Sequence, residues 1–193
     1  MIHTAKPYVV GLTGGMASGK STVLAAFKAC GVFTVSADDL ARQVRAQAQV
    51  QDFLRQEFGS ADPAVIARQV FANPQQRQAL EAHIHPLVWQ EAQKQLDSCG
   101  ARWAVFEVPL LFESGWDKYM DLTLLILAGE ETLSARLKER GLTREDYLSR
   151  LKTQWSPAQK AARADVILTN RSTKTDLEQK VCRLARALDT IYG

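Results

Sequence analysis

The chain has 193 residues, of which 46% are hydrophobic and 23% charged, and its formal net charge is +3. This length suits one domain that can bury a core without disulfides or structural metals. The composition excludes a disordered chain, and the lack of a long apolar run excludes a transmembrane helix. The first residues lack the apolar core of a signal peptide, so we expect a cytoplasmic protein with no membrane partner.

The cysteines and the charge narrow the partners further. Cys30, Cys99 and Cys182 are scattered and have no metal-ligand spacing, so we expect three small, buried apolar residues in a reducing compartment. The small net charge does not require a nucleic-acid partner, and we expect none.

Five short apolar runs predict β-strands. They are Tyr8–Thr13, Phe33–Ser36, Trp103–Val108, Leu122–Leu127 and Val166–Leu168. Helical patterns separate them and fill most of the region from 38 to 98. Strands that are apolar throughout and alternate with helices are typical of a parallel sheet covered on both faces, so the sequence predicts an α/β fold.

Local signals set several helix boundaries. Ser156-Pro157 and a capping box at Thr143 each predict a helix start, whereas His85-Pro86 predicts a break between helices. A last helix is expected to begin near Thr173. Its predicted apolar face consists of Leu177, Val181, Leu184, Leu188 and Ile191.

A glycine-rich segment between the first strand and the first helix matches G-x-x-x-x-G-K-[ST] at every fixed position. An ordinary glycine-rich turn does not explain the strand before it and the helix after it. Loop amides in this setting form a nest for phosphate oxygens, Lys20 reaches the β- and γ-phosphates, and the Ser21 hydroxyl holds Mg²⁺. The predicted phosphate-binding residues are Gly14, Gly15, Met16, Ala17, Ser18, Gly19, Lys20 and Ser21.

A phosphate loop indicates a nucleoside triphosphate but not a reaction, so the acids near other strand ends matter. Asp38 follows the second strand, where an acid can accept a proton from a substrate hydroxyl, and Arg42 can pair with phosphate. The alternative is a capped helix start with a solvated Arg42. Glu107 ends the third strand, a usual place for an acid that orients Mg²⁺, and Glu113 lies further along the same loop.

The region from Ser134 to Arg163 is basic, with eight Lys or Arg against three Asp or Glu. A solvated helical surface would have this composition. With a phosphate loop present, the region is better explained as a lid whose arginines neutralise a phosphoryl transition state. The candidate arginines are Arg136, Arg140, Arg144 and Arg150.

Taken together, these segments resemble the dephospho-coenzyme A kinase family. The resemblance rests on the glycine loop, Ala37-Asp38 with Arg42, His85-Pro86-Leu87, the run from Pro109 to Glu113, Arg150 with Gln154, and Ala164-Asp165 with Asn170. It implies a P-loop kinase fold with a five-stranded parallel sheet. It also implies transfer of the ATP γ-phosphoryl group to the ribose 3′-hydroxyl of dephospho-coenzyme A, the last step of coenzyme A synthesis.

The resemblance also implies how the chain is divided and what its site residues do. One domain over 1–193 would have a core at about 8–40, 101–135 and 164–193, acceptor-binding helices at about 41–100, and a lid at about 136–163. The segment from Gly14 to Thr22 would bind the phosphates of ATP. Asp38 would be the base, and Lys20 and Arg140 would act on the phosphates. Arg42, His85 and Glu113 would bind the acceptor, Asn170 would lie near adenine, and Ser21 and Glu107 would hold Mg²⁺.

Three positions depart from the family pattern. Ala17 stands where the family commonly has glycine, and a methyl group there costs strain if φ is positive. Ser36 replaces the first acid of Asp-Ala-Asp, and the segment from Gly59 to Phe71 is shortened, which affects the acceptor side. Two alternatives therefore stay open: a kinase for another small acceptor, and a nucleotide-binding switch without catalysis.

Overall fold

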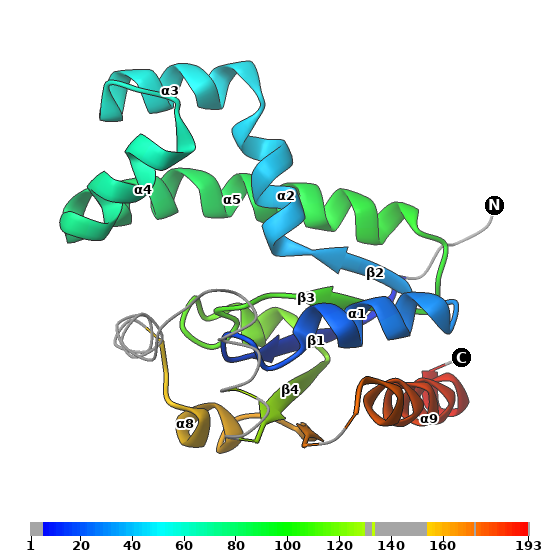
Figure 1. Cartoon of the computed structure of the whole chain (residues 1–193). Helices are drawn as coiled ribbons and strands as arrows, with labels where there is room; N and C mark the ends of the chain where they lie inside the picture. The colour runs from blue at the N-terminus through cyan, green and yellow to red at the C-terminus, as the bar shows by residue number, and fades with distance from the viewer. Residues whose placement is uncertain (1–5, 130–132, 134–153, 172, 193) are drawn as a thin grey trace. The chain divides into compact units, whose positions relative to one another are not determined.

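A computed structural model of the chain describes residues 6–129, 133, 154–171 and 173–192. The predicted capping box at Thr143 and the four lid arginines lie outside these residues. The strands are β1 (Tyr8–Gly14), β2 (Phe33–Ser36), β3 (Trp103–Glu107), β4 (Leu122–Ala128) and β5 (Val166–Asn170). The helices are α1 (Lys20–Ala29), α2 (Ala37–Arg45), α3 (Ala48–Phe58), α4 (Pro63–Ala72), α5 (Pro74–Ser98), the 3₁₀ helix η1 (Trp116–Tyr119), α8 (Pro157–Ala161) and α9 (Lys174–Tyr192) (Figure 1).

The five strands form one sheet in the order β2-β3-β1-β4-β5, which confirms the predicted α/β fold with a five-stranded parallel sheet. Leu12 of β1 lies in register with Glu107 of β3, and Gly14 lies in register with Ile126 of β4. Parallel strands end at the same edge, so the loops that follow β1, β3, β4 and β5 all leave from the edge at which ligands bind in such sheets.

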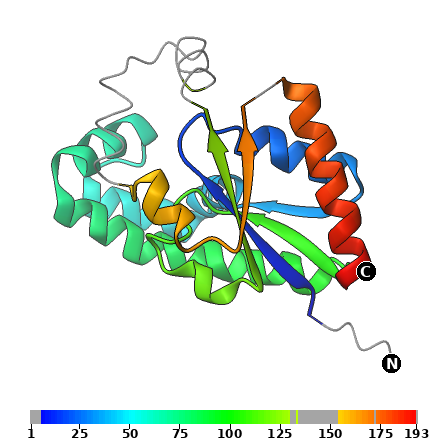
Figure 2. The same ribbon diagram turned by 90° about the horizontal axis from the view of Figure 1, so that it is seen from below.

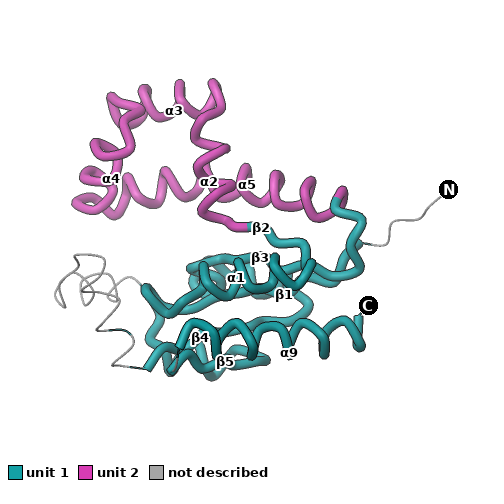
Figure 3. The backbone as a smooth tube through the Cα atoms, turned by 45° about the vertical axis from the view of Figure 1, so that its right-hand side comes forward, with its two compact units in different colours: residues 1–35, 99–193 teal, residues 36–98 magenta. Residues whose placement is uncertain are grey.

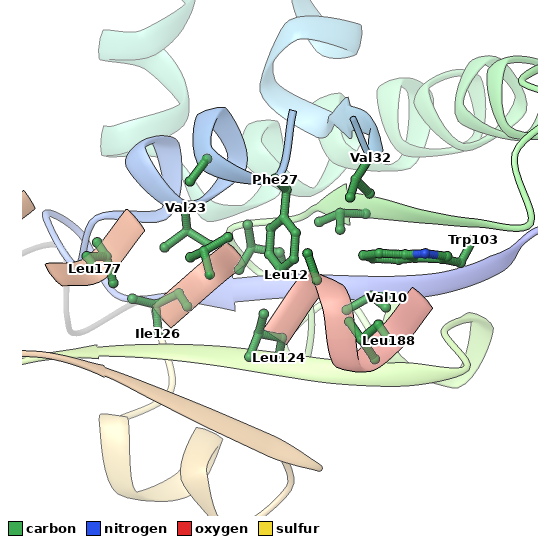
Figure 4. Close-up of a cluster of buried hydrophobic side chains, with 14 residues drawn as sticks. Val10, Leu12, Val23, Phe27, Val32, Trp103, Leu124, Ile126, Leu177 and Leu188 are labelled. Carbon is green, nitrogen blue, oxygen red and sulfur yellow. The ribbon is translucent and has the colours of Figure 1, made fainter. Parts of the chain in front are cut away.

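The two compact parts of the chain are a sheet unit, residues 1–35 and 99–193, and a helical unit, Ser36–Ser98 (Figure 3). In the sheet unit, apolar side chains of α1 and α9 pack against those of β1 and β4. Val23 and Phe27 come from α1, Leu177 from α9 and Leu124 from β4 (Figure 4). In the same unit, α8 and α9 lie on either side of β4 and β5 (Figure 2). Burial of this apolar surface is the main force that fixes α1, and with it the loop at its N-terminus.

The α9 face is close to its prediction, since Leu177, Val181 and Leu188 are buried and Leu184 is partly so. Ile191 is 66% exposed, so its predicted place in the core is wrong. At this end of α9 the following residue, Tyr192, packs against the core and stacks on Tyr8 of β1. Within the described residues, no helix combines the length and apolar character needed to cross a membrane.

The cysteine prediction is wrong for two of the three residues. Cys30, which caps the C-terminus of α1, forms a disulfide with Cys182 of α9, and their Cα atoms are 6.2 Å apart. The sequence separation of 152 residues hides the pair, because only the packing of α1 against α9 brings the two sulfurs together. Cys99 is a free, half-buried thiol.

In the helical unit, Ser36 caps α2, and its hydroxyl accepts a hydrogen bond from the Asp39 amide. The predicted break at His85-Pro86 is wrong, because α5 continues from Pro74 to Ser98 through Pro86. A proline inside a helix removes one backbone hydrogen bond. The buried residues Ile84 and Val88 flank it on the packed face of α5, and this tertiary packing keeps the helix continuous.

Candidate phosphate-binding site

The glycine loop has the strand–loop–helix geometry that its sequence predicts. It leaves the carboxyl end of β1 at Gly14 and enters α1 at Lys20, with Gly19 at φ 103° as the cap. No described side chain caps the first turn of α1, the turn in which a helix has backbone amides without an intrahelical partner. Those amides and the positive end of the helix dipole favour an anion at such a helix start.

The Lys20 ammonium lies over the loop that precedes it. Its Nζ donates hydrogen bonds to the carbonyl oxygens of Gly14 at 2.9 Å and Gly15 at 3.1 Å. The residue is half-buried, and these two carbonyl oxygens hold its charge beside the loop. Ser21 is exposed and Thr22 is half-buried on the first turn of α1.

Two small residues give the loop its shape. A Cβ on Gly14 would lie 2.7 Å from the Ile126 carbonyl oxygen and 2.7 Å from the Ser18 hydroxyl, so glycine is required for the close approach to β4. Ala17 has φ 57°, so the strain foreseen for a methyl group at this position is present.

Asn170 holds the loop from the side of β5. The residue is 0% exposed, and its Nδ2 donates a 2.8 Å hydrogen bond to the Ser18 carbonyl oxygen. Because the Asn170 side chain has no exposed surface, it can affect adenine binding only through the residues that it contacts. The contact in the structure is to the phosphate loop, a role that sequence reasoning did not identify.

The acid at the end of β3 and the acid on the loop after it have different surroundings. Glu107 is 6% exposed and lies at the carboxyl edge of the sheet, beside the start of the glycine loop. Glu113 forms an ion pair with Lys160 of α8, with 2.9 Å between Oε1 and Nζ, and accepts a 2.9 Å hydrogen bond from the Trp155 amide. Sequence reasoning missed Lys160, because nothing local distinguishes it from a surface lysine.

Asp165, from the Ala-Asp segment quoted for the resemblance, joins the starts of β4 and β5. Its Oδ2 accepts hydrogen bonds from the Thr123 hydroxyl at 2.6 Å and the Thr123 amide at 2.8 Å. These two hydrogen bonds stabilise the carboxylate and lower the pKa of Asp165 below its ordinary value of 3.8.

The helical unit carries the predicted acceptor residues. Asp38 is exposed in the first turn of α2, and no described residue donates a hydrogen bond to its carboxylate. Arg42 lies one turn on and pairs with Asp39, and His85 is half-buried on α5. The alternative interpretation of this segment is a capped helix start. Ser36 supplies that cap, so the Asp38 carboxylate is not needed for capping.

The predicted lid residues and the predicted metal site remain. Arg140 and the other lid arginines lie outside the described residues, and Gln154 lies within them. Among the described residues, no three His, Cys, Asp or Glu side chains gather into a metal-binding group. A protein-only metal cage is therefore not found in this part of the chain.

The comparisons with known proteins agree on one family. The family model described as dephospho-CoA kinase matches residues 8–176. The dephospho-CoA kinase of Geobacillus kaustophilus is 34% identical over 94% of this chain and 97% of its own length. That of Thermus thermophilus is 37% identical over 93% of this chain and 91% of its own length.

Solved structures support the same relationship. The crystal structure of TT1252 from Thermus thermophilus superposes with a TM-score of 0.85 at 34% identity and covers 95% of this chain and 99% of that one. The dephospho-CoA kinase from Campylobacter jejuni shares the fold, with a TM-score of 0.68 at 23% identity and coverage of 93% and 96%. The chain therefore belongs to the dephospho-CoA kinase family.

Proposed function

We propose that this chain is an ATP-dependent kinase that phosphorylates the ribose 3′-hydroxyl of dephospho-coenzyme A and releases coenzyme A and ADP. The observation that carries the proposal is the family match over residues 8–176, which includes both the glycine loop and the helical unit. ATP and dephospho-coenzyme A are the small-molecule partners. Neither a nucleic acid nor a membrane has a part in this reaction, and we place it in the cytoplasm.

The loop residues position the nucleotide. The amides from Gly14 to Thr22 bind phosphate oxygens, and Lys20 neutralises charge as the γ-phosphoryl group leaves. Asn170 acts indirectly in this scheme, by holding the Ser18 carbonyl and thus the loop's shape.

Mg²⁺ is the proposed metal, and the residues present fit it. This ion is usually bound by one or two protein oxygens together with waters and substrate phosphates. The Ser21 hydroxyl and the buried Glu107 carboxylate at the sheet edge are donors of that type. When bound, Mg²⁺ would neutralise charge on the β- and γ-phosphate oxygens.

Asp38 is the proposed base. Its exposed carboxylate accepts the proton of the 3′-hydroxyl as that oxygen attacks the γ-phosphorus and the bond to ADP breaks. Arg42, His85 and Glu113 are the proposed acceptor contacts, and Arg140 is the proposed lid arginine. Arg42 would leave its exposed pair with Asp39 to bind phosphate, a small loss because exposed ion pairs contribute little.

The test is ADP release by the purified protein with ATP and Mg²⁺, with and without dephospho-coenzyme A, and mass spectrometry of the product. Adenosine and AMP serve as competing acceptors. Asp38→Asn should lower kcat by about 100-fold or more, the usual loss for a general base. Asp52→Asn, an exposed carboxylate of the same unit paired with Arg55, is the matched control.

Three results would contradict the proposal. Stimulation by AMP or adenosine alone would indicate another acceptor. ATP binding without acceptor-dependent ADP release would indicate a nucleotide-binding switch. Near-normal turnover by folded Asp38→Asn would remove the base assignment and leave the overall reaction standing.

A further inference from the structure

Lys160 is a buried cation that the phosphate-loop motif does not account for. Its side chain is 1% exposed, whereas lysines are almost always at the surface unless paired. Its Nζ lies 2.9 Å from Glu113 Oε1 and donates a hydrogen bond to the Pro109 carbonyl oxygen at 3.3 Å. Both partners belong to the Pro-Leu-Leu-Phe-Glu segment after β3, so Lys160 fixes both ends of that segment.

Glu113 uses only one of its carboxylate oxygens in these contacts. Oε1 takes the Lys160 ammonium and the Trp155 amide, and the side chain is 12% exposed. Oε2 is buried, and no described residue donates a hydrogen bond to it. A buried carboxylate oxygen without a donor is costly, so its place in the fold indicates a donor that is not part of the described chain.

The same contacts reach the phosphate loop. The Pro109 carbonyl that accepts from Lys160 also accepts a 3.1 Å hydrogen bond from the hydroxyl of Thr13, the residue before Gly14. Lys160 also lines a cavity of about 50 Å³ together with residues of the glycine loop. One ammonium therefore connects Glu113, the end of β1 and the back of the loop.

We propose that Lys160 is a positioning residue for phosphoryl transfer. It holds the Glu113 carboxylate in one orientation, in which the buried Oε2 can accept a hydrogen bond from the acceptor substrate, and it fixes Pro109 against the phosphate loop. The inference rests on the proposed function, in which Glu113 contacts the acceptor. Lys160 itself is too buried to contact either substrate.

A second ion pair between the same two segments provides a control. Arg163 Nη2 lies 2.7 Å from Asp117 Oδ2, and the guanidinium lies over the rings of Phe112 and Trp155. This pair also ties the segment after β3 to the segment around α8. No described hydrogen bond connects it to Pro109 or Glu113. A merely structural tether predicts the same consequence for both pairs, whereas positioning predicts a catalytic effect for the Lys160 pair alone.

The experiment is a double-mutant cycle of Lys160→Met, Glu113→Gln and the double variant, with Asp117→Asn as control. Steady-state kinetics with ATP and dephospho-coenzyme A are measured beside Tm. Each single variant should lower kcat/KM for dephospho-coenzyme A by about tenfold or more, since small displacements of positioned groups have effects of this size. The double variant should lose no more than either single variant, because both act through the same carboxylate.

Stability separates the two explanations. A single variant leaves one buried charge unpaired, so Tm should fall, and the double variant should recover part of that loss. If Lys160→Met fails to fold, the kinetics of the more stable double variant still test the proposal. Asp117→Asn should keep kcat/KM within about twofold.

Unchanged kcat/KM in a folded Lys160 variant with a lowered Tm would overturn positioning, as would losses that multiply in the double variant. An equal kinetic loss in Asp117→Asn would also overturn it. The proposed function fails separately, when the wild-type protein shows no ADP release that depends on dephospho-coenzyme A.

Discussion

Reduction of the Cys30–Cys182 disulfide should lower the thermal stability of the sheet unit. The bond joins the C-terminus of α1 to the middle of α9, the two helices that cover β1 and β4. A disulfide stabilises mainly by restricting the unfolded chain, and the effect grows with the length of the closed loop.

The loop here is long, which makes the expected effect large. For a sequence separation of 152 residues, the chain-entropy relation gives about 17 cal/mol/K, or about 5 kcal/mol at 25 °C. Measured values are usually lower, about 2–4 kcal/mol. A chain of 193 residues has an unfolding entropy of about 0.4 kcal/mol/K near its Tm, so the expected loss is about 5–10 °C, with an upper value near 12 °C.

The assay is thermal unfolding followed by circular dichroism, with and without dithiothreitol, and thiol titration to verify the state of the cysteines. The Cys30→Ala/Cys182→Ala variant should unfold near the Tm of the reduced protein and should not respond to dithiothreitol. Cys99→Ala should respond as the wild-type protein does. Equal Tm values for verified oxidised and reduced protein would refute the reasoning, as would a response to dithiothreitol that persists in the double variant.

Three further substitutions test the local geometry. Gly14→Ala should destabilise the protein by about 1–3 kcal/mol and weaken ATP binding, because the added Cβ would lie 2.7 Å from a backbone oxygen of β4. Gly15→Ala is the control: the space around Gly15 is open, so this variant should keep the Tm. Ala17→Gly relieves about 1–2 kcal/mol of left-handed strain, but it loses about 0.8 kcal/mol of methyl burial and about 0.4–1 kcal/mol through the freer unfolded chain. The free energy of unfolding measured with urea should therefore change by less than about 1 kcal/mol. A gain above about 2 kcal/mol would show that these terms do not offset one another. Asp165→Asn should cost about 1 kcal/mol at neutral pH, a discounted value for an exposed residue. Because the folded pKa of Asp165 is lowered, its contribution is present above pH 3.8 and disappears as pH falls through the folded pKa, so the gap between wild type and Asp165→Asn should narrow at acid pH; a constant gap would contradict the assignment.

The sequence predicts the five strands well because each is a short apolar run; the sheet buries most of β1, β3 and β4, and the edge strands β2 and β5 are partly exposed. The exception is the end of β5, where Thr169 and Asn170 continue the strand beyond the predicted Leu168. Asn170 is polar and fully buried, so its burial depends on the Ser18 carbonyl, 152 residues away in the chain. A pattern of apolar residues does not carry that information.

The failures share the same physical cause. Pro86 has a local preference for a helix break, yet the packing of α5 inside the helical unit keeps the helix whole. Cys30 and Cys182 have no meaningful spacing, yet the contact of α1 with α9 joins them. In each case a tertiary contact decides the outcome, and local propensity is the smaller term.

Residues on which the family resemblance rests need not contact a substrate to affect its selection. Asn170 holds the Ser18 carbonyl, and Asp165 joins the starts of two strands through Thr123. Glu113 has one oxygen occupied by Lys160 and the other without a described donor. If Lys160 positions Glu113, a lysine that looks like any surface lysine in the sequence is as necessary as the motif residue itself. A protein that kept the glycine loop and lost this buried pair would then be expected to bind ATP but to transfer phosphate only poorly to dephospho-coenzyme A.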